Sequence, residues 1–211
     1  MKKMVKQRGR PRAFDTAEAL ESALHVFWSE GFLNASLADL TAAMGINKPS
    51  LYTAFGDKEA LYLSALNHYA EQHLRCPAER LKENPDGKAA VREFLLALGA
   101  LFADPSLPGG CFIVNGSAGC GALTMPDAVK AALQNALRGN ETLLRQRLER
   151  AMADRQLAPD HSLTTLTAFF MVTVVGMSVM AKNGTGLDVL TQVVDTALAV
   201  WEEGCPQVPR R

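Results

Sequence analysis

The sequence has few of the features from which small cross-linked domains and common catalytic sites are built. Its 211 residues include four cysteines without a short paired spacing, so we interpret them as reduced thiols rather than a disulfide framework. It contains no phosphate-binding glycine loop, no HExxH and no GxSxG motif, and none of its four histidines has a convincing nucleophile partner. These absences exclude the enzymes built on those motifs, and we expect no catalytic residues, no cofactor and no metal.

The chain also lacks a net charge, because 22 lysines and arginines balance 22 acids. The balance is uneven, however. Residues 1–13 carry six basic side chains and no acid, Arg10 and Arg12 among them, which predicts a basic, flexible arm that contacts DNA or a merely solvated terminus. No apolar run of signal-peptide length follows this arm, so we expect a cytoplasmic protein.

Long uncharged runs are rare in the sequence. One stretch, residues 163–181, has no charge over about 19 residues, which is near the length needed to cross a bilayer. Threonine and serine interrupt it repeatedly, and there is no second span. A helix that is apolar all round is also typical of one buried on both sides, so we expect no membrane partner, with one face against a core or pocket and the other against a second subunit.

Residues 36–58 are the most informative part of the sequence. Ser36 is a good N-cap for a helix over residues 37–44, and Asp39 completes the pattern of a capping box. Gly45 suits the left-handed turn that follows, and Pro49 suits the first turn of the next helix. Two short helices joined by a tight turn predict a helix-turn-helix, whose second helix fits the major groove of DNA.

The segment GINKPSLYTAFGDKEALYLSAL resembles the recognition helix and following helix of the TetR/AcrR family of bacterial transcriptional repressors. The match covers residues 14–69, and the family pattern appears here as Gly45, Ser50, Leu51, Tyr52, Phe55 and Lys58. The resemblance implies an all-α fold of about nine helices. It divides the chain into the arm (1–13), a three-helix DNA-binding domain (14–70) and a domain for effector binding and dimerisation (71–205).

The same resemblance assigns contacts with double-stranded DNA. Lys48 and Lys58 would supply charge to phosphates, and Thr53 is the better candidate for a base edge. An alanine at position 54, where many members have a bulkier polar residue, leaves base specificity there open. The full set of predicted DNA contacts is Arg10, Arg12, Ser36, Lys48, Ser50, Tyr52, Thr53 and Lys58.

Apolar spacing predicts the remaining helices. We expect one at 15–30, stopped by Gly31, and a linking helix at 59–74, ended by Pro77. The others are expected at 89–103, 126–155, 163–181 and 187–203, with a short, glycine-weakened helix in 110–123.

By resemblance, the last two helices pair with their twofold mates in a homodimer, which predicts an interface of Val174, Met180, Leu190, Val194, Leu198 and Trp201. The effector pocket would suit a small hydrophobic or amphipathic molecule. Its predicted lining is Phe102, Cys111, Phe112, Asn115, Phe169, Phe170, Thr173 and Met177, although such residues are more often simply core.

The predicted function is therefore a ligand-responsive repressor that binds a palindromic operator as a dimer and is released by its effector. The alternative is a redox or electrophile sensor on the same scaffold, acting through Cys111 or Cys120. On a single helix, nine residues place these two thiols about 13 Å apart, which is beyond disulfide reach. Each would then act singly or with another cysteine.

Overall fold

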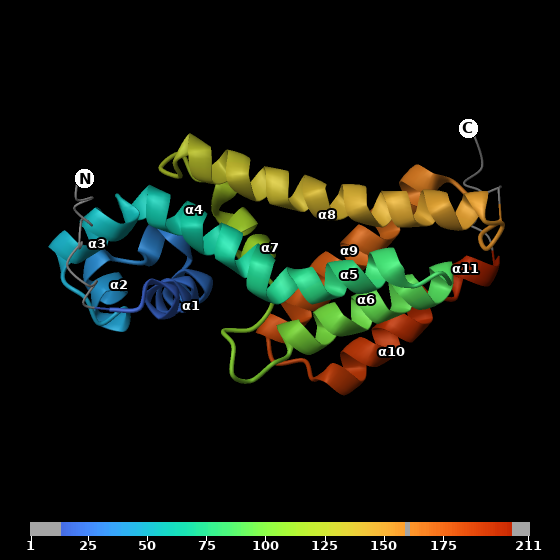
Figure 1. Ribbon diagram of the computed structural model, residues 1–211. Coiled ribbons are helices and arrows are strands. Elements are labelled where there is room, and N and C mark those ends of the chain that lie inside the picture. The colour runs from blue at the N-terminus through green and yellow to red at the C-terminus, as the bar shows by residue number, and fades with distance from the viewer. Residues whose placement is uncertain (1–13, 159–160, 204–211) are drawn as a thin grey trace, which may run out of the picture.

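A computed structural model describes residues 14–158 and 161–203, and every regular element within those ranges is helical. Figure 1 shows a small N-terminal unit at one end of an elongated molecule, with long helices stacked beside one another in the rest. The all-α expectation is confirmed.

The N-terminal unit consists of three helices whose ends the sequence specifies locally. Asp15 caps the first helix, Ser36 and Asp39 form a complete capping box at the second, and Asn47 caps the third. Gly45 has a φ of +64°, as the tight turn between the second and third helices requires. The bounds are α1 Thr16–Asn34, α2 Leu37–Ala43 and α3 Lys48–Phe55.

Gly31 interrupts α1 but does not end it. Its φ of +75° breaks the helical backbone, and one further turn follows. Phe32 in that turn is buried and lies against Tyr62 of the next long helix, with the ring centroids 5.3 Å apart. Burial of this ring holds the last turn in helical form after the glycine.

The linking helix continues past the predicted stop. It consists of α4 Lys58–Tyr69, a π-helical turn η1 Ala70–Leu74 and α5 Arg75–Glu83. Pro77 lies in the first turn of α5, where the missing N–H is tolerated, so it does not end the helix as we expected. Single π-helical turns inside α-helices are frequently found at functional sites.

The C-terminal unit packs four long helices around a second part of the core. The helix α6 lies between α5 and α10, and α9 contacts α6, α8 and α10 (Figure 1). By length and composition α9 is long and apolar enough to cross a membrane, yet in the structure it is one of these bundled helices. The bounds are α6 Gly87–Phe102, α7 Phe112–Ser117, the 3-10 turn η2 Ala118–Gly121, α8 Asp127–Ala153, α9 Leu163–Lys182, α10 Leu187–Ala197 and α11 Val200–Glu203.

An aromatic cluster joins the two units. The Trp28 ring of α1 meets the Tyr69 ring edge-on at 4.9 Å between centroids, and Phe112 of α7 lies 5.6 Å from Tyr69. Trp28 also donates from Nε1 to the carbonyl oxygen of Gly109 at 3.2 Å. Aromatic pairs of this kind add roughly 0.5–1.5 kcal/mol each beyond their burial. The N-terminal unit is therefore held to the rest of the chain by packed rings, not by a loose linker.

A group of charged and titratable side chains borders this cluster. The Glu21 carboxylate of α1 lies 2.7 Å from Nε2 of His68, 3.2 Å from Nε2 of His25 and 3.6 Å from Nε2 of His73. Three of the four histidines thus share one carboxylate where α1 meets α4 and η1. Burial lowers the pKa of His73, and Glu21 partly offsets that effect.

Gly116 provides a test of the packing between α4 and α7. A Cβ at this position would lie 2.5 Å from the Tyr62 hydroxyl oxygen and 3.1 Å from Leu133. We expect Gly116→Ala to lower the free energy of unfolding by about 1–3 kcal/mol, as overpacking does. Gly139→Ala is the matched control, because an added Cβ there meets nothing within 4 Å on the exposed side of α8. It should raise stability by about 0.4–1 kcal/mol in the same urea titration. Equal effects at the two sites would contradict the close approach.

The Glu21 group makes a prediction about titration. We expect the His73 imidazole to titrate below its ordinary value of 6.5 in an NMR pH series, because burial disfavours its charged form. A neutral buried imidazole stabilises the fold above its unfolded pKa, and this contribution is lost as the pH falls through the lower folded pKa. Glu21→Gln should lower the pKa of His73 further, since the carboxylate favours the imidazolium. A rise in that variant would show that Glu21 is not its partner.

Candidate functional site

The helix-turn-helix presents a polar surface on α3. Leu51 is fully buried and fixes the inner face of this helix, whereas Tyr52 is 50% exposed. Lys48 and Thr53 are exposed on the same helix, and the Thr53 hydroxyl donates to the carbonyl oxygen of Pro49 at 2.8 Å. This arrangement leaves an ammonium, a phenol and a threonine methyl on the outer face, which are groups suited to a nucleic-acid backbone and base edges.

Two of the predicted contacts are also engaged inside the protein. The Lys58 ammonium lies 4.6 Å from the centroid of the Phe32 ring, a cation–π contact, and partial burial lowers its pKa. The Ser36 hydroxyl lies 2.6 Å from Oδ2 of Asp39 and holds the pKa of that carboxyl below its ordinary value. A phosphate at the start of α2 would therefore meet a carboxylate beside the free N–H groups of the first turn. Arg10 and Arg12 lie outside the described residues.

The structure places most of the residues predicted for the ligand pocket in the core. Phe102, Phe112, Phe170 and Met177 are fully buried in the core, and Cys111 is 4% exposed. Asn115 donates from Nδ2 to the carbonyl oxygen of Gly109 at 3.1 Å, so it supports a loop. Phe169 and Thr173 lie in a shallow hollow between α9 and α10. Most of the predicted residues are apolar and recur at helical spacing. Core residues and pocket-lining residues both have these properties, so the pattern does not distinguish them.

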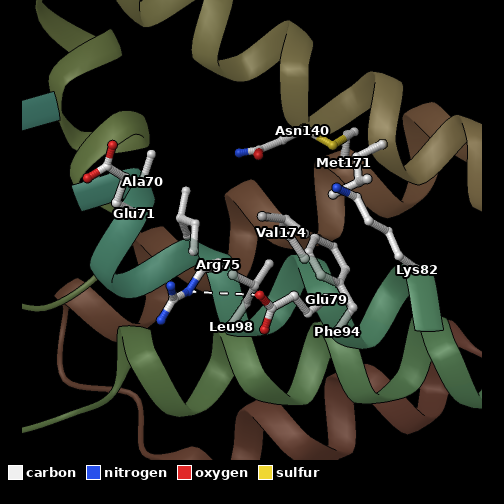
Figure 2. Close-up of a pocket in the computed structure, with 13 residues that line it drawn as sticks. Ala70, Glu71, Arg75, Glu79, Lys82, Phe94, Leu98, Asn140, Met171 and Val174 are labelled. Atoms are coloured by element: carbon white, nitrogen blue, oxygen red, sulfur yellow. Dashed lines mark ion pairs between the residues drawn. The ribbon is translucent and has the colours of Figure 1, made fainter. Parts of the chain in front are cut away.

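A cavity of about 430 Å³ instead lies between η1 and α5 on one side and α6, α8 and α9 on the other (Figure 2). This volume is within the roughly 300–1,000 Å³ of small-molecule sites. Phe94 and Leu98 of α6 and Met171 and Val174 of α9 form much of its apolar wall. Val174, which the resemblance predicts in the dimer interface, instead lines this cavity and is only 7% exposed.

Polar groups in this cavity come from the linking helix and α8. Figure 2 shows Asn140 projecting from α8 and Lys82 reaching over from the end of α5. Arg75 and Glu79 form an ion pair at 3.9 Å, drawn as the dashed line, and Glu71 lies on the adjoining turn.

The sequence contained a signal for this wall. Ala70, Leu74, Ala78 and Lys82 recur every four residues, so they lie along one helix face. The pattern runs across Pro77, which the sequence predicts as the end of the helix.

Most of the residues predicted for the dimer interface are also buried inside the protomer. Leu190 and Val194 are fully buried within the protomer, Leu198 is 3% exposed, and Trp201 donates from Nε1 to the carbonyl oxygen of Gln156 at 2.8 Å. These side chains belong to the core that α10 shares with α6. The exposed apolar residues of α9 lie on the face opposite its buried residues, and Leu187 and Val189 of α10 are partly exposed as well; the residues on α9 are Phe169, Val172, Val175, Val179 and Met180.

Cys111 is unfavourably placed for thiolate chemistry. Burial raises the pKa of the Cys111 thiol, which accepts a hydrogen bond from the Tyr69 hydroxyl at 3.4 Å. A protonated, enclosed thiol is a poor nucleophile. Cys120 is half-buried in η2, so the segment between the two residues is not the single helix that we assumed. Among the described residues, no group of histidines, cysteines or acids has the arrangement of a metal site.

Comparison with known proteins places this architecture in a family. Residues 19–65 match the family model described as bacterial regulatory proteins, tetR family, and residues 87–197 match the one described as tetracyclin repressor-like, C-terminal domain. The HTH-type transcriptional repressor ComR of Escherichia coli (strain K12) is 32% identical over 203 residues, which are 94% of each chain.

Solved structures agree with these matches. A cysteine mutant of the TetR family transcriptional regulator CifR, complexed with 26-bp double-strand operator DNA, is 40% identical with a TM-score of 0.83, over 91% of this chain and 100% of that one. A putative TetR transcriptional regulator from Rhodococcus sp. RHA1 is 32% identical with a TM-score of 0.60, over 89% and 98% respectively. The chain with the exposed α3 and the cavity beside α5 therefore belongs to the TetR family of transcriptional regulators, a class of DNA-binding proteins and not of enzymes.

Proposed function

We propose that this protein is a repressor that binds a palindromic operator as a homodimer and releases it when a small amphipathic effector occupies the cavity beside α5. The observation that carries the proposal is the continuous helical run from α4 through η1 to α5. One end of this run packs beside α3 and the other forms a wall of the cavity. A ligand in the cavity therefore contacts the same run of helix that carries the recognition helix.

The repressor would read DNA with the outer face of α3. Lys48 is proposed to neutralise a phosphate, Tyr52 to donate its hydroxyl to another, and Thr53 to contact a base edge. Ser36, Ser50 and Lys58 would position the unit on the backbone, with Arg10 and Arg12 of the N-terminal arm beside them. Two such units must meet half-sites about one helical turn apart, which requires a dimer.

The exposed apolar face of α9 and α10 is the proposed dimer interface. Val172 is 70% and Val179 49% exposed on α9, and Leu187 is 44% exposed on α10. Exposed apolar side chains gathered on adjoining helices are typical of interaction surfaces. Met180, predicted for the interface from the sequence, lies on this face, whereas the buried residues of α10 support it from beneath.

Release of the operator requires differential binding. An effector shifts the equilibrium only if it prefers the conformation in which the two recognition helices are wrongly spaced. The cavity wall formed by Ala70 and Leu74 belongs to the π-helical turn, which also carries His73 against Trp28. Displacement of this turn would alter how the DNA-binding unit packs on the remainder of the chain.

The direct test is binding of the purified protein to its own upstream DNA at two salt concentrations. We expect tight, salt-sensitive binding that competitor DNA does not remove, because sequence-specific regulators combine phosphate neutralisation with base readout. Binding no tighter than to random DNA, with a ligand-free sample verified by mass spectrometry, would contradict a role at that operator.

Tyr52→Phe tests the recognition helix. The variant removes one hydroxyl from an exposed ring, so it should unfold at the same temperature as the wild type. Two symmetry-related hydroxyl–phosphate bonds, each contributing roughly 0.5–1.5 kcal/mol, predict about a tenfold or greater loss of operator affinity. The measurement is fluorescence anisotropy with labelled operator. An unchanged affinity would show that the Tyr52 hydroxyl does not contact a phosphate.

Val172→Glu tests the dimer interface. A charge at the most exposed valine of α9 would be buried without a partner in the dimer, so we expect a monomer by light scattering after size exclusion. Leu123→Glu is the matched control, because Leu123 is 99% exposed and lies far along the chain from α9 and α10. It should remain dimeric. A dimer that survives Val172→Glu at micromolar concentration would place the interface elsewhere.

A further inference from the structure

Arg147 on α8 is a buried cation whose hydrogen bonding is incomplete. The residue is 4% exposed, and its Nη2 donates to the carbonyl oxygens of Asn84 and Pro85 at 3.1 Å each. Its Nε and Nη1 are buried and have no hydrogen-bond partner in the described parts of the chain. A buried guanidinium with unpaired donors is costly, and burial accordingly lowers the pKa of Arg147.

The arginine lies in a small niche with two further cations. A hollow of about 150 Å³ is lined by Leu81 and Lys82 of α5 and by Leu143, Gln146, Arg147 and Arg150 of α8. We call this group the basic niche. Two acids influence it: Asp154 lies 3.5 Å from Nε of Arg150, and Asp86 favours the charged form of Arg147 from a distance. Three cations against these two carboxylates leave the niche positive.

The basic niche adjoins the apolar cavity. Lys82 and Leu143 line both spaces, so they form the boundary between them. The other charges near the cavity do not favour one sign, because Arg75 pairs with Glu79 and Glu71 is an acid. Lys82, by contrast, makes no ion pair with any described residue, and Figure 2 shows it reaching over from the end of α5 toward the cavity. The positive side of the cavity is thus the side next to Arg147.

We propose that the effector is an amphipathic anion, with its apolar body against Phe94, Leu98 and Met171 and a carboxylate or phosphate group in the basic niche between Lys82, Arg147 and Arg150. This inference rests on the proposed effector role of the cavity and adds the chemical class of its ligand. Guanidinium groups bind carboxylate and phosphate oxygens by charge-assisted hydrogen bonds, and Arg147 has two nitrogens, Nε and Nη1, that each lack an acceptor.

The placement also gives the anion a way to act on the fold. Lys82 belongs to α5, whereas Arg147 and Arg150 belong to α8. An anion held by both helices would draw the end of α5 toward α8. Because α5 is continuous with η1 and α4, this shift would be passed to the DNA-binding unit, while a neutral molecule in the cavity would lack that attraction.

The experiment measures the affinity of the full-length protein for matched ten-carbon probes by calorimetry, and the release of labelled operator by the same probes. Decanoate and decyl phosphate carry the two anionic groups, decanol is neutral, decylammonium is cationic, and inorganic phosphate lacks the apolar body. We expect both anions to bind at least tenfold tighter than decanol and decylammonium. Inorganic phosphate should bind more weakly than decyl phosphate. The stronger of the two anions identifies the group that the niche prefers.

Variants locate the site. Lys82→Met with Arg150→Gln changes two exposed side chains and should remove the preference for anions, so that decanoate and decanol bind with similar affinity. Arg138→Gln with Arg145→Gln removes the same charge from the exposed face of α8 and should change nothing. Arg147→Gln should abolish the preference as well, and the double variant keeps the test valid if that protein does not fold. Met171→Trp, which fills the cavity, should weaken decanoate and decanol alike.

The outcomes separate the two proposals. Equal affinity for decanoate and decanol, or a preference for anions that survives in Lys82→Met/Arg150→Gln, overturns the amphipathic anion, as does a failure of both anions to bind. Anions that bind through the niche without releasing the operator support the ligand class and overturn the effector role. Operator release by decanol as effectively as by decanoate supports an effector cavity and overturns the role of the niche.

Discussion

The packing of Trp28 against Tyr69 and Phe112 is the constraint on which the rest of this structure depends. These rings come from α1, α4 and α7, so they fix the DNA-binding unit to both the linking helix and the C-terminal unit. The Trp28 indole also donates to Gly109, next to the loop whose Cys111 N–H donates to the Ser178 hydroxyl of α9 at 2.8 Å. Packed, hydrogen-bonded groups therefore connect α9 and the linking helix to the N-terminal unit.

The π-helical turn η1 is the point at which this constraint meets the cavity. Ala70, Glu71 and Leu74 line the cavity, while His73 of the same turn contacts the Trp28 ring at 5.7 Å and shares Glu21 with two other histidines. One helical turn thus borders both the cavity and the N-terminal unit. A turn with this wider geometry has an alternative, the regular α-helix, and the two forms would place His73 differently against α1.

The helix α9 is almost entirely apolar or neutral, yet its side chains lie in three different environments. Phe170 and Met177 are buried in the protomer core, Val174 faces the cavity, and Val172 and Val179 are exposed. An apolar residue is suited to each place. Mean hydropathy therefore resembles that of a membrane span, and only the positions of the neighbouring helices distinguish the three roles. Arg147 shows the same limit for a charged residue. It is buried, although it lies on α8 among interleaved acids and bases that are typical of a solvated helix face.

The sequence by itself determined the local elements, because their causes are local. The capping box of Ser36 and Asp39 and the turn at Gly45 depend on residues within a few positions of one another, and both were predicted correctly. The tertiary structure alone decided which apolar faces became core, cavity wall or open surface. Leu190 and Val172 are both apolar residues at helical spacing. Leu190 is buried because α10 packs against α6, whereas Val172 remains exposed on α9. The basic niche was likewise hidden, since Lys82 and Arg147 are 65 positions apart and meet only when α5 packs on α8.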